Sequence, residues 1–147
     1  MVRGAGHLGF DGGKAVSRVG IDITSVGRIR SLAERRPDAM GRLFTGGELQ
    51  DAGTTRQRWS RLASRFAAKE ALIKAAGGLH GSRYIDVEVR RQPGGPPSVS
   101  VSGPLGQWLA DRGLSVAMTV SHEDEFAVAM VWLNSQGDDG DGAGVDS

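Results

Sequence analysis

The stretch WSRLASRFAAKEALIKAA, residues 59–76, decides the fold of this chain. An α-helix turns by about 100° per residue, so each side chain can be assigned to one side of the helix. One face then holds Trp59, Leu62, Ala63, Phe66, Ala67 and Ile73. The other face holds Ser60, Arg61, Ser64, Arg65 and Ala68. We predict a helix over about 58–76 that packs its apolar face against a core and ends at Gly77-Gly78.

Glu70 interrupts the apolar face of this helix. It lies one turn after Phe66 and nearly one turn before Ile73, with Lys74 at i+4 on the same side. A buried carboxylate is costly unless a charged or hydrogen-bonding group meets it. Two interpretations stay open: an internal ion pair, with Lys74 or an arginine elsewhere, and a metal ligand at the rim of a cleft. The spacing alone favours the ion pair, because buried acids are usually paired.

Residues 16–23 predict the first strand. The apolar residues Val19, Ile21 and Ile23 recur at every second position, the pattern of a half-buried strand. Asp22 therefore points to the opposite side from the isoleucines. Aspartate is unfavourable inside a strand, which suggests a local reason for its presence.

The remaining segments complete an α+β domain. A helix capped by Thr24 or Ser25 should run to about Arg36, and Thr45-Gly-Gly-Glu48 has the spacing of a capping box. Further strands are predicted over 84–91, 98–102, 114–121 and 126–133, and a short helix over 104–112. The last strand is apolar on both faces and should be central. This order predicts an α+β fold in which a mainly antiparallel sheet packs against a long central helix.

The composition excludes several classes of function. The 147 residues suffice for one domain with its own core. A formal net charge of +1 argues against a nucleic-acid partner, and the absence of cysteine excludes disulfides and thiolate chemistry. The chain has no apolar run long enough to span a bilayer and no apolar signal region at its N-terminus. We therefore expect a cytoplasmic protein with no membrane partner.

The two ends of the chain differ from its middle. Residues 1–14 are rich in glycine and show no periodicity, so we expect a flexible leader. Residues 135–147 are rich in glycine and aspartate, and we expect a disordered acidic tail. The predicted domain spans residues 15–134.

Three segments, taken together, resemble a known family. They are VGIDI at 19–23, RFAAKEA at 65–71 with Lys74, and Ser121-His122 followed by FAVA at 126–129. A weaker fourth segment is LFT at 43–45 with Glu48. In this order, from about Val16 to Leu133, they resemble the holo-acyl-carrier-protein synthase family of 4′-phosphopantetheinyl transferases.

The resemblance implies a reaction and a metal site. Such enzymes move 4′-phosphopantetheine from coenzyme A to a serine of an apo acyl carrier protein and release 3′,5′-ADP. Asp22 and Glu70 match the family's magnesium ligands, and with Lys74 they match its catalytic residues. Magnesium prefers oxygen ligands and usually takes one or two carboxylates, with phosphate and water completing its shell. It would offset the charge that builds on the leaving phosphate.

The resemblance also implies binding residues and an assembly. The positions that match coenzyme A contacts are Arg65, Lys74, Pro97 and His122. Arg28 matches a contact to the carrier protein, whereas a solvated basic face is the alternative for its arginine-rich helix. The small members of the family form homotrimers with the site at the subunit boundary, so the site residues need not all come from one chain. The carrier could belong to fatty-acid or polyketide synthesis.

Other interpretations remain open at this point. The chain could be a non-catalytic α+β module that binds carrier proteins, with a structural ion pair at Glu70, or another magnesium-dependent nucleotide-binding enzyme. The general base could be Glu48, a metal-bound water or an acid behind the metal ligands. Lys69, on the flank of the central helix, is expected to be solvated. The acidic residues Glu123–Glu125, directly after His122, could weaken coenzyme A binding if they lie near its phosphates.

Overall fold

The computed structural model describes residues 6–9, 16–91 and 93–135. In chain order its elements are β1 (Gly6–Gly9), β2 (Val16–Ser25), α1 (Val26–Arg35), α2 (Pro37–Leu43), α3 (Gly46–Ala52), α4 (Arg58–Ala76), the 3₁₀ turn η1 (Tyr84–Asp86), β3 (Val87–Arg91), β4 (Pro97–Val101), α5 (Gly103–Asp111), β5 (Leu114–His122) and β6 (Phe126–Ser135). The expected tail beyond residue 135 and most of the expected leader lie outside the described residues.

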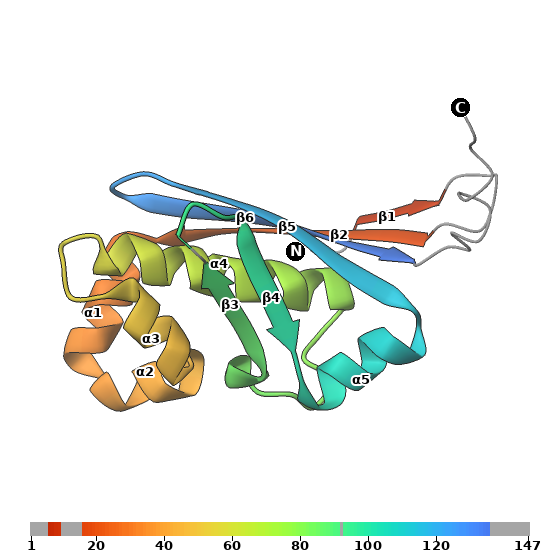
Figure 1. Cartoon of the computed structure of the whole chain (residues 1–147), viewed down its shortest axis with the longest axis horizontal. Helices are drawn as coiled ribbons and strands as arrows, with labels where there is room; N and C mark the ends of the chain where they lie inside the picture. Colours follow the sequence, from red (N-terminus) through yellow and green to blue (C-terminus); the bar gives the residue numbers. More distant parts are fainter. Residues whose placement is uncertain (1–5, 10–15, 92, 136–147) are drawn as a thin grey trace.

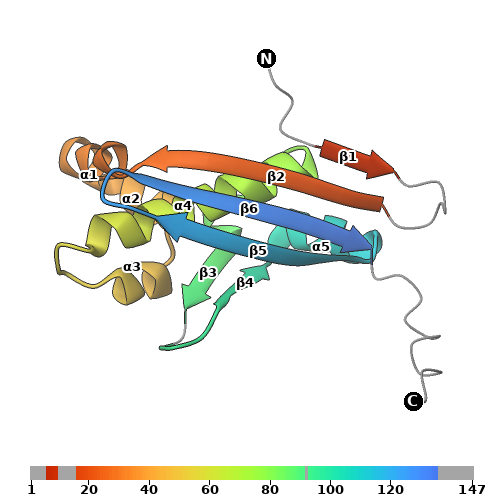
Figure 2. The same ribbon diagram turned by 90° about the horizontal axis from the view of Figure 1, so that it is seen from above.

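Two layers enclose the central helix α4. A four-stranded antiparallel sheet, in the order β1-β2-β6-β5, covers one side of the helix (Figure 1). The β3–β4 hairpin forms a separate two-stranded sheet, and with the shorter helices it covers the other side. Seen from above, β6 runs between β2 and β5, and the hairpin extends past the β5 edge (Figure 2). The predicted α+β fold and the central position of the last strand are confirmed.

Local sequence signals explain the helix boundaries near β2 and α4. The Ser25 hydroxyl caps α1 by accepting a hydrogen bond from the backbone N–H of Arg28 at 3.2 Å. The predicted capping box is present at α3: the Glu48 N–H donates to Thr45 Oγ1 at 3.1 Å, and the Thr45 N–H donates to Glu48 Oε1 at 2.8 Å. Helix α4 ends as predicted at Gly77, whose φ of 79° is in the left-handed region that suits glycine.

Some predicted elements need correction. Helix α2 was not predicted, although Pro37 occupies a first-turn position where proline is favoured. Residues 84–86 form a 3₁₀ turn where the prediction extended the strand. Gly6–Gly9, expected in the flexible leader, form strand β1 and pair with β2. None of the helices in the described ranges combines the length and apolar character needed to cross a membrane.

Strand β2 approaches α4 through a residue without a side chain. A Cβ atom added to Gly20 would collide with the carbonyl oxygen of Ala71 and would lie 2.8 Å from the amide nitrogen of Ala75. Only glycine allows the strand and the helix backbone to come this close. Side chains alternate along a strand, so Asp22 and Thr24 face the helix together with Gly20.

The isoleucines of β2 lie on the opposite face of the sheet. Ile21 and Ile23 are 53% and 64% exposed, and Phe126 beside them on β6 is 49% exposed. The predicted alternation is therefore confirmed, with Asp22 on the opposite side from the isoleucines, and the apolar positions of this strand point away from α4. The alternating pattern gives two faces and does not say which one is covered.

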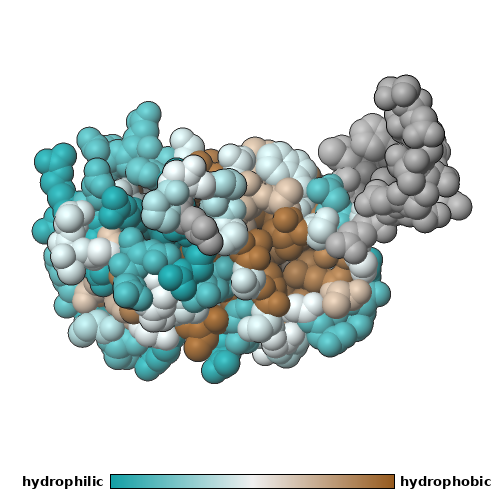
Figure 3. Space-filling view, viewed as in Figure 1, coloured by the Kyte–Doolittle hydropathy of each residue, from teal (hydrophilic) through white to brown (hydrophobic). Residues whose placement is uncertain are grey.

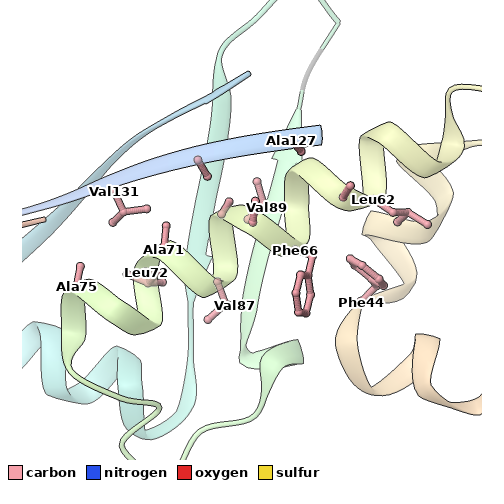
Figure 4. Close-up of a cluster of buried hydrophobic side chains, with 14 of the residues drawn as sticks. Phe44, Leu62, Phe66, Ala71, Leu72, Ala75, Val87, Val89, Ala127 and Val131 are labelled. Carbon is pink, nitrogen blue, oxygen red and sulfur yellow. The ribbon is translucent and has the colours of Figure 1, made fainter. Parts of the chain in front are cut away.

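Helix α4 is buried on more than one side. In Figure 4, Ala127 and Val131 of β6 lie above the helix, while Val87 of β3 and Phe66 lie below it. All four side chains belong to the buried core. The helix therefore contacts both layers and holds them together.

Burial on two sides corrects the predicted polar face of α4. Ser64, Arg65 and Ala68 were assigned to the face away from the core, yet they are 6%, 7% and 0% exposed. A one-sided stripe is typical of a helix on the surface of a protein, and α4 lies inside this one. Its alanines allow a close approach from either layer.

The contact at Gly20 generates a prediction about stability. Gly20→Ala should lower the free energy of unfolding by about 3 kcal/mol or more, because the new methyl group meets the helix backbone, which cannot move aside. Chemical denaturation measures the change. Gly41→Ala is the matched control: a Cβ atom there meets nothing within 4 Å, and alanine favours α2 by up to about 1 kcal/mol. Equal stabilities for the two variants would contradict the close contact.

Candidate functional site

Asp22 projects from β2 into a polar cluster beside α4. Its Oδ1 accepts a hydrogen bond from Lys74 Nζ at 2.9 Å, and its Oδ2 accepts one from the Thr24 hydroxyl at 2.7 Å. Lys74 Nζ also donates to the carbonyl oxygen of Ile21 at 3.1 Å. The Asp22 side chain is 14% exposed and that of Lys74 is 40% exposed. Lys74 therefore pairs with Asp22, and the alternative in which it pairs with Glu70 is wrong.

Glu70 lies in the same region and is held by a tyrosine. The Tyr84 hydroxyl donates a hydrogen bond to Glu70 Oε1 at 2.7 Å, and the Tyr84 ring stacks on Phe66 with 5.9 Å between ring centroids. Burial, then the hydrogen bond to Glu70 and the charges of Glu70 and Asp22, raise the pKa of Tyr84 to about 12, and Arg28 opposes this. The phenol therefore stays protonated at neutral pH. The charges of both Glu70 and Asp22 therefore affect the Tyr84 hydroxyl.

A basic cavity lies on another side of α4. It has a volume of about 660 Å³, within the usual range for small-molecule sites. Residues that line it include Asp51, Arg61, Arg65, Val89, Arg91, Pro97, Val120 and His122. Three of the four predicted coenzyme A contacts are thus brought together from three distant parts of the sequence. The fourth, Lys74, lies instead beside Asp22 and Glu70, and we call the group of these three residues and Tyr84 the acidic cluster.

Arg65 is the most buried charge of this cavity. It is 7% exposed, and its Nη1 donates to the carbonyl oxygen of Arg61 at 3.0 Å. Its Nε is buried and has no hydrogen-bond partner in the described structure. Burial lowers the pKa of Arg65, and the charges of Asp51 and Glu48 oppose the shift; an arginine stays charged at neutral pH. A buried, charged donor without a partner at a cavity is a suitable ligand for an anion.

The acidic cluster and the basic cavity lie on different flanks of α4. Glu70 and Lys74 follow Arg65 by five and nine residues, which places them about 140° and 180° around the helix. The sheet shows the same separation, because Asp22 and Val120 are both paired with Ala129, on either side of β6. Two strand spacings, about 10 Å, therefore separate the acid from the cavity wall. The helix stands between the two groups.

Other predicted residues lie nearer the outside. Arg28 is exposed at the start of α1, and its charge reaches Tyr84, so it belongs to the side of the acidic cluster. The acids of the turn 123–125 line a separate hollow with Phe126, and within the described part of the chain they do not line the basic cavity. The acids therefore line a different part of the surface from the cavity, although Glu123 directly follows His122 in the chain.

Lys69 and Glu48 form a buried ion pair that the sequence analysis missed. Both side chains are fully buried, and Lys69 Nζ donates to Glu48 Oε1 at 2.7 Å. Lys69 also donates to the carbonyl oxygens of Leu43 at 2.7 Å and Tyr84 at 3.1 Å, while Glu48 Oε2 accepts from the Val89 N–H at 2.8 Å. Desolvation lowers the pKa of Lys69, and the charge of Glu48 opposes it. A solvated Lys69 was wrong, and Glu48 is too buried to serve as the general base.

The carboxylates of the acidic cluster suit a hard cation. Glu70 lies within hydrogen-bond distance of the Tyr84 hydroxyl, and the charge of Asp22 also reaches that hydroxyl, so two carboxylates lie in one region. Among the described residues no group of three or more His, Cys, Asp or Glu side chains could hold a metal by itself. Magnesium is usually bound by one or two carboxylates together with substrate phosphates, so two acids fit this ion.

Comparison with known proteins decides the family. A family model described as the 4′-phosphopantetheinyl transferase superfamily matches residues 18–131. The chain belongs to this superfamily. The match begins within β2 and ends within β6, and it therefore includes both flanks of α4.

Three proteins similar to this chain are each named holo-acyl-carrier-protein synthase. The holo-[acyl-carrier-protein] synthase of Myxococcus xanthus is 39% identical over 122 residues, which cover 82% of this chain and 96% of the relative. That of Desulforudis audaxviator is 42% identical over 114 residues, 76% of this chain and 87% of the relative. The solved holo-(acyl-carrier-protein) synthase of Bacillus anthracis, in complex with CoA (3′,5′-ADP), is 34% identical with a TM-score of 0.65, covering 80% of this chain and 96% of that one.

The buried ion pair generates a second prediction about stability. Lys69→Met should lower the free energy of unfolding by about 3–5 kcal/mol, because it leaves the Glu48 carboxylate buried without its counter-charge. Arg42→Met is the control, since Arg42 pairs with Asp38 at 3.1 Å on the surface, and loss of that pair should cost less than about 1 kcal/mol. Denaturant melts of both variants give the comparison. A small effect at Lys69 would show that the pair is not needed to hold the layers together.

Proposed function

We propose that this chain transfers 4′-phosphopantetheine from coenzyme A to a serine of an apo acyl carrier protein. The observation that carries the proposal is the basic cavity, which gathers Arg65, Pro97 and His122 from distant segments. These are the residues that the family resemblance implies for coenzyme A. The named relatives are holo-acyl-carrier-protein synthases, and that of Bacillus anthracis was solved in complex with CoA (3′,5′-ADP).

The reaction is a phosphoryl transfer. The serine oxygen forms a bond to the phosphorus that carries pantetheine, and the bond from that phosphorus to the bridging oxygen breaks. The product 3′,5′-ADP leaves with the electron pair, and the serine proton passes to a base. Glu48 cannot be that base, because it is fully buried and already bound to Lys69 and two backbone N–H groups.

The residues of the basic cavity bind and orient the phosphates in this proposal. Arg61, Arg65 and Arg91 line the cavity and provide its positive charge. Guanidinium groups bind phosphate oxygens through paired N–H donors. His122, at the end of β5, lies at the exposed rim of the cavity and adds a further donor.

Asp22 and Glu70 would hold magnesium. Bound there, the ion supplies a positive charge that offsets the negative charge of the pyrophosphate. Lys74 adds a second positive charge 2.9 Å from Asp22 and can also donate to a phosphate oxygen. The non-catalytic alternative required an ion pair at Glu70, and among the described residues Glu70 instead accepts from the neutral Tyr84 hydroxyl.

The carrier protein would dock beside the acidic cluster. Arg28 is exposed on α1, which begins immediately after β2. Its positive charge acts to lower the pKa of Tyr84, so it lies near the acidic cluster. Carrier proteins have an acidic character, so a basic helix next to the reacting groups attracts them. A carrier from fatty-acid or polyketide synthesis in the cytoplasm fits this proposal.

A complete site would need two chains. Within one chain α4 stands between the acids and the basic cavity, which lie toward the β2 and β5 sides of the sheet. If the cavity of one chain faces the acids of the next, a single coenzyme A can contact both. A head-to-tail interface closes into a ring when its rotation divides a full turn evenly, and a homotrimer is the ring that the family resemblance implies.

The exposed apolar surfaces support such an assembly. Ile21, Ile23 and Phe126 form an uncovered patch on the outer face of the sheet. Figure 3 shows a second apolar area between β4 and β5, where Val101 and Met118 are among the partly buried residues of these strands. Exposed apolar surfaces of this kind mark interaction sites, and each could be covered by a neighbouring chain.

The proposed activity gives a direct prediction. Incubation with coenzyme A, magnesium and an apo carrier protein should add the mass of one phosphopantetheine group to the carrier, as read by mass spectrometry. Glu70→Gln and Asp22→Asn should each slow this gain by at least about 100-fold, because several kcal/mol of charge stabilisation is lost. Both changes keep the size of the side chain.

Glu34→Gln is the control for this assay. Glu34 is exposed on α1 and, among the described residues, pairs with Arg30, so its loss should leave the rate unchanged. Normal turnover in both acidic-cluster variants would remove the magnesium role. No mass gain from the wild-type chain with any of several apo carriers would remove the activity and favour a binding module.

A further inference from the structure

Tyr84 is anchored at three points around Glu70. Its carbonyl oxygen accepts from the buried Lys69 ammonium at 3.1 Å. Its ring stacks on Phe66 with an interplanar angle of 10°. Its hydroxyl donates to Glu70 Oε1 at 2.7 Å. The backbone, the ring and the hydroxyl of this one residue are therefore each fixed by a different part of α4.

The anchoring connects the buried ion pair to the acidic cluster. Lys69 is fully buried, and its ammonium is bound by Glu48, by the carbonyl of Leu43 and by the carbonyl of Tyr84. Lys69 and Glu70 are neighbours on α4, so the pair that fixes the Tyr84 backbone and the carboxylate that the Tyr84 hydroxyl contacts belong to the same turn of one helix. The path from Lys69 through Tyr84 to Glu70 needs no flexible segment.

The hydrogen bond restricts the Glu70 carboxylate. A glutamate side chain has three rotatable bonds and, on a helix, can reach a lysine at i+4. Here Lys74 binds Asp22, and the Tyr84 hydroxyl holds Glu70 Oε1 away from it. Oε2 is then the oxygen left for another partner, with its direction set by the bond to Oε1.

We propose that Tyr84 is a positioning residue that orients the Glu70 carboxylate for a divalent cation. The inference rests on the proposed magnesium role of Glu70 and adds a residue to it. Tyr84 does not itself bind the ion. Groups that hydrogen-bond to a ligating side chain commonly change metal affinity by about 10- to 100-fold when they are removed.

The test compares metal affinity and turnover in Tyr84→Phe. This variant keeps the ring that stacks on Phe66 and the carbonyl that binds Lys69, and it loses only the hydroxyl. We expect its magnesium dissociation constant, measured by calorimetry with coenzyme A present, to rise by about tenfold. At saturating magnesium its kcat should return close to the wild-type value, because the chemical groups are unchanged. Ser115→Ala, which removes a hydroxyl at the far end of β5, should change neither quantity.

Two further measurements separate the possible failures. Glu70→Gln tests the proposed function: if it binds magnesium as tightly as the wild-type chain, the magnesium role of Glu70 is wrong. If Glu70→Gln loses affinity and Tyr84→Phe does not, the positioning role is wrong and the magnesium role stands. A metal-free melting curve tests for a merely structural role, because a lower melting temperature with unchanged magnesium affinity would also overturn the inference.

Discussion

The close contact between Gly20 and helix α4 is the constraint on which the rest of the structure depends. It brings the backbone of β2 against Ala71 and Ala75, so the strand and the helix are fixed relative to each other. Asp22 lies two residues further along the strand and reaches the flank of the helix where Lys74 meets it at 2.9 Å. A larger residue at position 20 would push the strand away from the helix and move Asp22 away from Lys74.

The helix also divides the molecule. Its opposite flanks carry an acidic cluster, centred on Asp22 and Glu70, and a basic cavity centred on Arg65. Beneath it, the buried pair of Lys69 and Glu48 connects α4 to the helices and the hairpin of the second layer. In the proposed function, α4 therefore carries both parts of the transfer site but separates them within one chain.

The sequence predicted the elements better than their surroundings. Helix α4, the capping box at Thr45 and the central last strand follow from local spacing and were found. Which face of a strand is covered depends on the other layers, so the alternation in β2 did not say that Asp22 would face the helix. Lys69 could have been suspected, because helical spacing places it in the arc of Leu62 and Phe66. Tyr84 carried no local signal, since its contacts with Lys69 and Glu70 join segments separated by a loop.

The measurement that tests the separation by α4 most directly uses two variants that each impair one half of the site, Glu70→Gln in the acidic cluster and His122→Ala in the basic cavity. Each is assayed alone, and the two are then co-expressed in equal amounts and purified together. If the site forms between chains, about a quarter of the interfaces in the mixed assembly join two intact halves, and about a quarter of the wild-type transfer activity returns. If each chain carries a complete site, the mixture stays as inactive as its components, and the account of a shared site is contradicted.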